Sequence, residues 1–167
     1  RSHDLGETLG NVVDLVAKRL DADVCSVYLR GSDLQQLVLA ATVGLAKESV
    51  GKVRLALGEG LVGHAAVRGE AMAFADAQSH PAYRYFPETG EERFASLMAA
   101  PLRVRGSAGA PFTIGALVIQ TRERREFSEA DLELLDTCAQ VIAPVVMNAQ
   151  LLAVVASGDE RKSRLLE

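Results

Sequence analysis

The chain has 167 residues, of which 49% are hydrophobic and 24% are charged, a size and balance typical of one soluble globular domain. Its 18 Lys and Arg are outnumbered by 22 Asp and Glu, and the net charge is −4. This excludes nucleic acid as an expected partner, because phosphate binding needs clustered cations. No apolar run is long enough to span a bilayer, so we expect a cytoplasmic domain without a membrane partner.

The first half of the chain predicts a helix followed by an antiparallel meander. Apolar residues recur at intervals of three and four from Leu5 to Leu20, which places them on one face of an amphipathic helix. The segments 23–30, 34–44 and 51–57 are typical of strands, and Gly31 to Asp33 form a hairpin turn between the first two.

The second half predicts further short elements and two long strands. Residues 61–68 indicate a helix of about two turns that ends at Gly69, and 71–76 indicate a short strand. Residues 77–93 are polar and aromatic, and their prolines and glycine indicate loops and helical turns. The strands 96–104 and 112–122 are apolar at odd and even positions alike, so we expect them to be covered on both faces.

A long helix is expected to begin after Ser128. Ser128 and Asp131 have the spacing of a capping box, with Asp131 in the place usually taken by Glu or Gln. Pro144 lies within the apolar stripe that follows, so we expect a kink or a cost of about 3 kcal/mol there. Together these elements predict an α+β fold with a central antiparallel sheet. The first and last helices pack on one face, and the 76–94 insert encloses a pocket on the other.

Gly58, Gly60 and Gly63 have the G-x-G-x-x-G spacing of a dinucleotide-binding turn. Three features oppose a Rossmann site: the following helix is short, Glu59 would stand beside the phosphates, and the motif follows hairpin-linked strands instead of opening a βαβ unit. A P-loop is excluded because no Gly-Lys-Ser/Thr follows.

The same glycines belong to a longer pattern. The stretches "LGEGLVGHAAVRGEAMAFADAQSHP", "FASLMAAPL" and "GALVIQTRERREFSEADLELLDTCA" resemble the GAF family of small-molecule sensing modules. The resemblance covers residues 5–152. It implies that the glycine segment turns the chain tightly into the short helix, for which glycine's tolerance of positive φ is suited.

Within that family, "FADAQSHPAYRYFPETGEERFASLMAAPL" resembles the N-terminal sensory domains of nitrogen-type phosphoenolpyruvate-protein phosphotransferases. The resemblance implies a GAF sensory domain over 1–156 and a charged helical linker over 157–167 that leads to missing phosphotransferase domains. The fragment would regulate and not catalyse, because the catalytic His of that group lies downstream. The alternatives are a GAF module of a sigma-54-dependent transcriptional activator and a ligand-free dimerisation module.

The resemblance also bears on the ligand. Gln120 and Thr121 stand where the cyclic-nucleotide-binding class has Asn-Lys, and no Cys lies in the insert for a bilin, so neither ligand is expected. Members of the phosphotransferase group respond to nitrogen status, which makes a small polar metabolite such as glutamine or 2-oxoglutarate the expected ligand. We expect no cofactor and no metal ion.

The predicted ligand-binding residues lie in the insert or on the strand that follows it: Asp76, Ser79, Tyr83, Tyr85, Arg93, Ser96 and Met98. Each has a structural alternative. Asp76 would serve equally well as a turn residue, the tyrosines would cap the core, and Arg93 would pair with a neighbouring Glu rather than clamp a carboxylate. His80 is expected to be a solvent-exposed loop residue.

Two further hypotheses remain. Leu135, Ile142 and Ala149 are seven residues apart, which suits either a homodimer seam or core packing. Cys25 and Cys138 lie in apolar segments, so we expect buried free thiols. This argues against a free-standing enzyme such as the methionine-sulfoxide reductases built on this fold, which need reactive cysteines.

Overall fold

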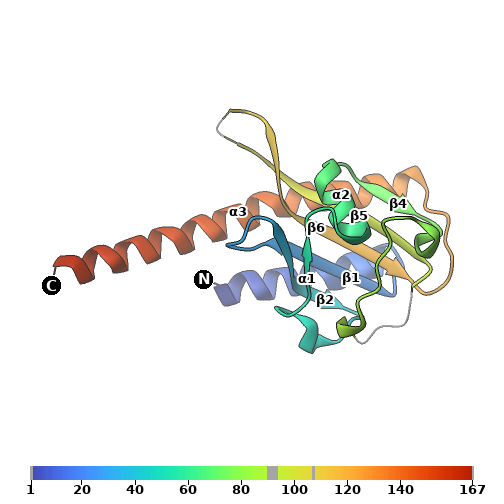
Figure 1. Cartoon of the computed structure of the whole chain (residues 1–167), viewed down its shortest axis with the longest axis horizontal. Helices are drawn as coiled ribbons and strands as arrows, with labels where there is room; N and C mark the ends of the chain where they lie inside the picture. The colour runs from blue at the N-terminus through green and yellow to red at the C-terminus, as the bar shows by residue number, and fades with distance from the viewer. Residues whose placement is uncertain (1, 90–93, 107, 167) are drawn as a thin grey trace.

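A computed structural model describes residues 2–89, 94–106 and 108–166, and within these ranges the side chains of residues 5–150. Six strands form one sheet in the order β3-β2-β1-β6-β5-β4, and every neighbouring pair is antiparallel (Figure 1). The helices are α1 (Ser2–Arg19), α2 (Gly60–Arg68) and α3 (Glu129–Leu166). The strands are β1 (Val24–Arg30), β2 (Gln36–Val43), β3 (Arg54–Ala56), β4 (Met72–Phe74), β5 (Ser96–Arg105) and β6 (Pro111–Thr121).

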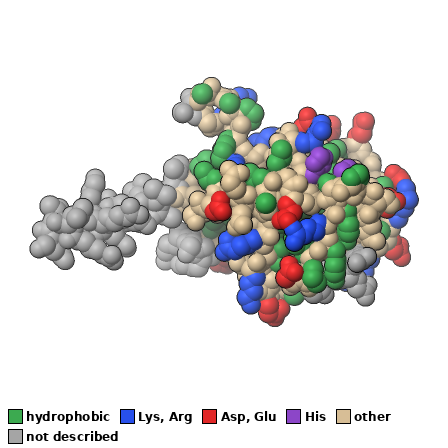
Figure 2. Space-filling model, viewed as in Figure 1, with side chains coloured by type: hydrophobic (Ala, Val, Ile, Leu, Met, Phe, Trp, Pro, Cys, Tyr) green, Lys and Arg blue, Asp and Glu red, His purple; other side chains and the backbone are tan. Residues whose placement is uncertain are grey.

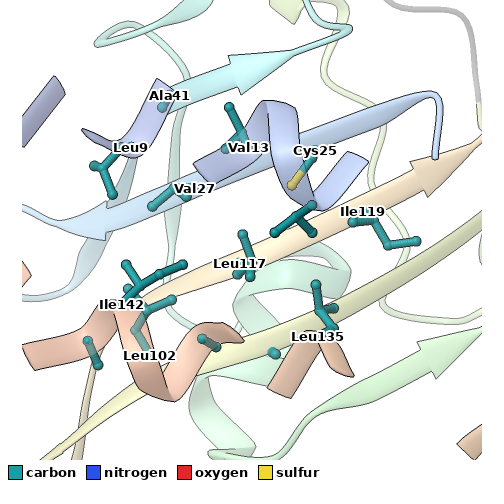
Figure 3. Packing of buried hydrophobic residues seen from close by; sticks show 14 of the residues in the cluster. Leu9, Val13, Cys25, Val27, Ala41, Leu102, Leu117, Ile119, Leu135 and Ile142 are labelled. Carbon is teal, nitrogen blue, oxygen red and sulfur yellow. The ribbon is translucent and has the colours of Figure 1, made fainter. Parts of the chain in front are cut away.

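The helix-covered face of the sheet carries one continuous apolar core. Leu9 and Val13 of α1 and Leu135 and Ile142 of α3 meet Leu117 of β6 there, and all five are at most 5% exposed (Figure 3). The periodic spacing of these residues on each helix is what brings them to the sheet. The predicted packing of the first and last helices on one face is confirmed.

Two residues of the seven-residue repeat in the last helix belong to this core, as the core-packing alternative predicted. Leu135 and Ile142 face the core, and in the part of α3 whose side chains are described the exposed large apolar side chains are Val141 and Val145. Pro144 does not end the helix, which is continuous on both sides of it.

The opposite face of the sheet is covered by α2 and by the insert. Leu61 and Ala65 of α2 and Phe94 at the end of the insert share one apolar cluster with Val118 of β6 and Leu97 of β5. The described part of the insert consists of loops and two 3-10 turns, at Ala77–Ser79 and Pro87–Thr89, as its composition predicted. β5 and β6 are buried on both faces, which confirms the expectation drawn from their continuous apolar pattern.

The predicted start of α3 is also confirmed. The Ser128 N–H donates to Asp131 Oδ2 at 3.1 Å, and the Asp131 N–H donates to Ser128 Oγ at 3.0 Å. Two N–H groups at the start of the helix are thus satisfied reciprocally. The hydrogen bond from the Ser128 N–H has the largest effect on the pKa of Asp131 and lowers it. Burial opposes this shift to a lesser extent, and the charge of Arg125 lowers the pKa further.

Candidate functional site

A cavity lies between the sheet and its α2-side cover. Its volume is about 40 Å³, which is small for a ligand site. The wall is formed by β1, β3, β5 and β6 from the sheet, by the start of α2, and by the insert. Its residues are Tyr28, Leu55, Glu59, Gly60, Leu61, Val62, Ala77, Tyr83, Arg84, Phe86, Thr89, Phe94, Ser96, Leu97 and Gln120.

The glycine motif brings α2 to the cavity. Gly58 and Gly60 have φ values of 87° and 69°, in the region that residues with a side chain rarely adopt. A Cβ on Gly63 would lie 2.8 Å from the Ala56 carbonyl oxygen, so α2 can approach β3 only because that Cβ is missing. The motif therefore shapes a turn and a close helix contact, as the resemblance to GAF domains implied.

Opposite charges meet at the mouth of the cavity. Glu59 precedes α2, and its Oε1 accepts the Ala56 N–H at 3.0 Å. The other carboxylate oxygen forms an ion pair with the Arg84 guanidinium, which lies over the Phe86 ring at 5.0 Å from the ring centre. This places one anion and one cation from separate segments beside the cavity, on a face where acidic and basic side chains are interspersed (Figure 2).

Two of the predicted ligand-binding residues, Tyr83 and Ser96, line this cavity. The Ser96 hydroxyl is fully buried and already has two backbone partners. It donates to the Ala75 carbonyl and accepts the Arg125 N–H at 2.9 Å. Ser96 thus holds the end of β4 against the segment that leads into α3.

Three other predicted residues, Asp76, Ser79 and Tyr85, are not among the residues of the cavity wall. Asp76 accepts the Ser79 hydroxyl at 2.8 Å on the surface of the insert, and its Oδ2 lies 3.9 Å from an Arg124 nitrogen. Tyr85 follows Arg84 but is not among the lining residues.

Met98 is placed on the other side of the sheet. It is fully buried in the core beneath the terminal helices, because alternate residues of a strand point to opposite faces and Leu97 takes the cavity side. Its prediction as a pocket residue is corrected accordingly. Arg93 lies outside the described residues.

His80 is half-buried and not the solvent-exposed loop residue that was expected. Its ring meets Phe74 edge-on at 4.9 Å and lies 5.6 Å from the ring of His64 on α2. Its Nδ1 accepts the Ala82 N–H at 3.0 Å. The histidine thereby ties the insert to α2 and β4.

The cysteines are placed for packing rather than for nucleophilic chemistry. Cys25 is fully buried, and desolvation raises the pKa of its thiol far above the ordinary value. Cys138 is half-buried, in contrast to the expected full burial, and desolvation also raises its pKa while the charge of Arg19 partly opposes the shift. Within the part of the chain that the structure describes, no three His, Cys, Asp or Glu side chains could hold a metal ion together.

Sequence reasoning did not select Arg84, Tyr28 or Gln120 as wall residues. Arg84 stands between two tyrosines of the insert that were selected, so its position was available as a signal. Tyr28 and Gln120 lie on β1 and β6, and the cross-strand pairing that brings these two strands together has no local signature.

A curved antiparallel sheet with two long helices on one face, and a small cavity beneath a short helix and a loop on the other, defines the GAF class of domains. The GAF domain family model matches residues 4–146, and the chain belongs to this family.

The curated relatives of the chain include proteins of the phosphoenolpyruvate-dependent phosphotransferase system. A phosphoenolpyruvate-dependent phosphotransferase system protein of Escherichia coli (strain K12) is 36% identical over 161 residues, which is 96% of this chain. The chain spans only 21% of that relative's length.

Two solved structures are similar in sequence as well as in fold. The GAF domain from a phosphoenolpyruvate-protein phosphotransferase of Coxiella burnetii is 35% identical with a TM-score of 0.80, over 90% of this chain and 86% of that one. The corresponding domain from Acinetobacter is also 35% identical, with a TM-score of 0.78, over 88% and 84%. None of the helices in the described part of the chain is long and apolar enough to cross a membrane.

Proposed function

We propose that this GAF domain senses a small polar metabolite and regulates phosphotransferase domains of the same polypeptide in the nitrogen-related phosphotransferase system. The proposal is carried by one observation: a cavity with an anion and a cation at its mouth lies in a chain that is 36% identical to a phosphoenolpyruvate-dependent phosphotransferase system protein and 35% identical to the GAF domain from a phosphoenolpyruvate-protein phosphotransferase. Glutamine and 2-oxoglutarate are the proposed ligands, in a cytoplasmic setting.

The size of the cavity determines how a ligand would enter. A volume of about 40 Å³ is well below the roughly 300–1,000 Å³ of small-molecule sites, so binding of glutamine requires the insert to move away from the sheet. The wall segment that would move is the one that carries Tyr83, Arg84 and Phe86, because it is attached to α2 through the exposed ion pair between Glu59 and Arg84. A ligand that carries both an ammonium and a carboxylate can replace this pair, satisfy both charges and open the cavity.

The two proposed ligands make opposite demands on Glu59. Glutamine carries an ammonium and a carboxylate and can pair with both Glu59 and Arg84. 2-Oxoglutarate carries two carboxylates, which Arg84 attracts and Glu59 repels. The charge at position 59 therefore distinguishes the two.

Isothermal titration calorimetry with glutamine, 2-oxoglutarate and cyclic GMP tests the proposal. Arg84→Gln should weaken binding of the true ligand by about 10- to 100-fold, the effect of losing one hydrogen bond to a charged group, whereas the surface variant Arg122→Gln should bind normally. Glu59→Gln should weaken glutamine but strengthen 2-oxoglutarate. The absence of both heat and thermal shift with all three compounds would remove the sensory proposal for them.

The small cavity also supports the second candidate, a ligand-free module that dimerises through its helices. Leu15 on α1 and Val141 on α3 are 66% and 67% exposed, so the outer surface of the helix pair is partly apolar. A monomer in sedimentation velocity at high concentration would contradict this candidate. If the protein dimerises, Val141→Glu should dissociate it while leaving ligand binding intact.

A further inference from the structure

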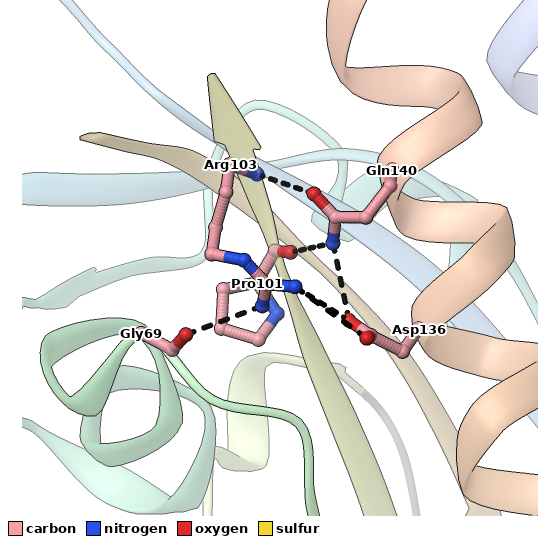
Figure 4. A network of polar contacts seen from close by, with 5 residues as sticks. All are labelled: Gly69, Pro101, Arg103, Asp136 and Gln140. Atoms are coloured by element: carbon pink, nitrogen blue, oxygen red, sulfur yellow. Dashed lines mark hydrogen bonds and ion pairs between the residues drawn. The ribbon is translucent and has the colours of Figure 1, made fainter. Parts of the chain in front are cut away.

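A polar network joins α3 to the edge of β5 at the point where β4 ends. The last residue of β5 that pairs with β4 is Ala99. Beyond it, Gln140 of α3 donates from Nε2 to the Pro101 carbonyl at 2.9 Å and accepts the Arg103 N–H at 3.3 Å (Figure 4). A carbonyl and an N–H two residues apart on one edge are the groups that a further strand would pair with. The Gln140 carboxamide takes the place of that strand and fastens α3 to the sheet.

The side chain of Arg103 extends from the same place to two different elements. Its Nη1 donates to the Gly69 carbonyl at 3.2 Å, at the end of α2, and its Nη2 donates to Asp136 of α3 at 3.1 Å. Gln140 Nε2 also donates to Asp136, at 3.1 Å. The Arg103 side chain is 25% exposed, so water competes less for these bonds than at an open surface. One guanidinium thus bridges the cavity-side helix and the terminal helix.

The bridge crosses an open groove. The groove is lined by Gly69, Glu70 and Ala71 on one side, by Arg103 at its base, and by Glu129, Leu132, Glu133 and Asp136 of α3 on the other. Arg103 at the base of the groove bonds to both of its sides, to the Gly69 carbonyl on one and to Asp136 on the other.

We infer that Arg103 is a positioning residue that transmits displacement of α2 to α3. The first residues of α2 line the cavity and its last turn is held by Arg103, and a helix of nine residues is a rod about 13 Å long. Displacement of the cavity end of α2 therefore moves the Gly69 carbonyl at its other end. Arg103 must then either move together with Asp136 or lose its hydrogen bond to Gly69 or to Asp136. Ligand binding can shift α3 to the extent that it favours one of these arrangements. This inference rests on the proposed sensory function for its biological role, but the coupling itself is testable without a ligand.

Hydrogen exchange measured by mass spectrometry on the 167-residue chain provides the first test. Leu61→Ala perturbs α2 at the cavity and is introduced into three backgrounds: wild type, Arg103→Gln, and Arg122→Gln as the matched control. Arg122 pairs with Asp23 at 3.6 Å on the surface, away from the groove. Amides of β1 report global stability, and exchange in residues 133–143 is expressed relative to them.

In the wild type and the Arg122→Gln background, Leu61→Ala should accelerate exchange of residues 133–143 by about threefold or more, within the roughly 2- to 30-fold range of coupling between sites. In the Arg103→Gln background the acceleration should fall below about twofold. Equal acceleration in all three backgrounds, or none in the wild type, would overturn the inference. If Arg103→Gln does not fold, Arg103→Lys replaces it, because an ammonium keeps the charge but lacks the forked donors that reach Gly69 and Asp136 together.

Saturating glutamine and 2-oxoglutarate provide a second test that separates the two proposals. The inference is supported if a ligand slows amide hydrogen exchange in both residues 60–66 and residues 133–143 of the wild type, and if the effect on residues 133–143 is lost in Arg103→Gln. Protection of 60–66 alone overturns coupling through Arg103 and leaves ligand binding intact. No protection anywhere removes these ligands, and the Leu61→Ala comparison then decides the coupling by itself.

Discussion

The two faces of the sheet are built in different ways. The face beneath α1 and α3 is covered by long helices with periodic apolar stripes, and its core is continuous and apolar. The other face is covered by a nine-residue helix and a loop-rich insert, and it contains a cavity with buried or half-buried polar groups such as Ser96 and Tyr28.

This difference in construction predicts that the two faces differ in rigidity. Long regular elements pack closely and resist deformation, whereas short elements joined by loops can move at lower cost. The helix-covered face therefore sets the stability of the domain, and the cavity face can change shape when a ligand binds. Arg103 links the two faces, because it bonds to Gly69 at the end of α2 and to Asp136 of α3. Gln140 fastens α3 to the same segment of β5.

The largest predicted effect compares a large-to-small substitution on each face. Leu117→Ala in the helix-side core should lower the free energy of unfolding by about 4 kcal/mol, while Leu61→Ala beside the cavity should cost about 2 kcal/mol. Both leucines are at most 4% exposed, but the cover around Leu61 can collapse into the new space. Urea denaturation measures both values. An equal or larger loss for Leu61→Ala would show that the cavity face is as rigid as the helix face.

A second prediction concerns the buried hydroxyl of Ser96, which ties the end of β4 to the segment that leads into α3. Ser96→Ala leaves the Ala75 carbonyl and the Arg125 N–H without this partner, so it should destabilise the domain by about 1–3 kcal/mol. Ser79→Ala on the insert surface should change the free energy of unfolding by less than about 0.5 kcal/mol. Thermal unfolding compares the two. Matching values would contradict a structural role for Ser96.

These two faces also differ in how well the sequence predicts them. The apolar repeat of α1, the capping box at Ser128 and the continuous strands β5 and β6 each carry a local signal, and the structure confirms all three. The cavity wall is assembled from residues that local patterns do not connect. Arg84 meets Glu59 through folding of the insert over α2, and Met98 faces the helices because the register of β5 decides its side.

The third prediction tests the local signal that begins α3. Ser128→Ala should cost about 1 kcal/mol of stability, the usual value for loss of a helix N-cap. The pKa of Asp131 is lowered in the folded state, so its contribution is present above the pKa of the unfolded chain and is lost as the pH falls through the lowered value. The stability difference between wild type and Asp131→Asn should therefore shrink on acidification, as measured by urea denaturation at a series of pH values. A difference that is independent of pH would contradict the hydrogen-bonded carboxylate.

The smallest expected change in stability is also the most informative about the cavity. Arg84→Gln removes an ion pair in which Arg84 is 53% and Glu59 is 29% exposed, and such a pair contributes about 0.2–1 kcal/mol that high salt reduces. The insert should nevertheless open more often, since this pair connects it to the N-terminus of α2. Hydrogen exchange in residues 82–89 should increase while exchange in α1 stays unchanged. The same increase should appear in wild type at high salt, because screening weakens the pair without removing it. If exchange rises equally in α1 and in the insert, the pair stabilises the whole domain, and the cavity face has no separate motion for a ligand to use.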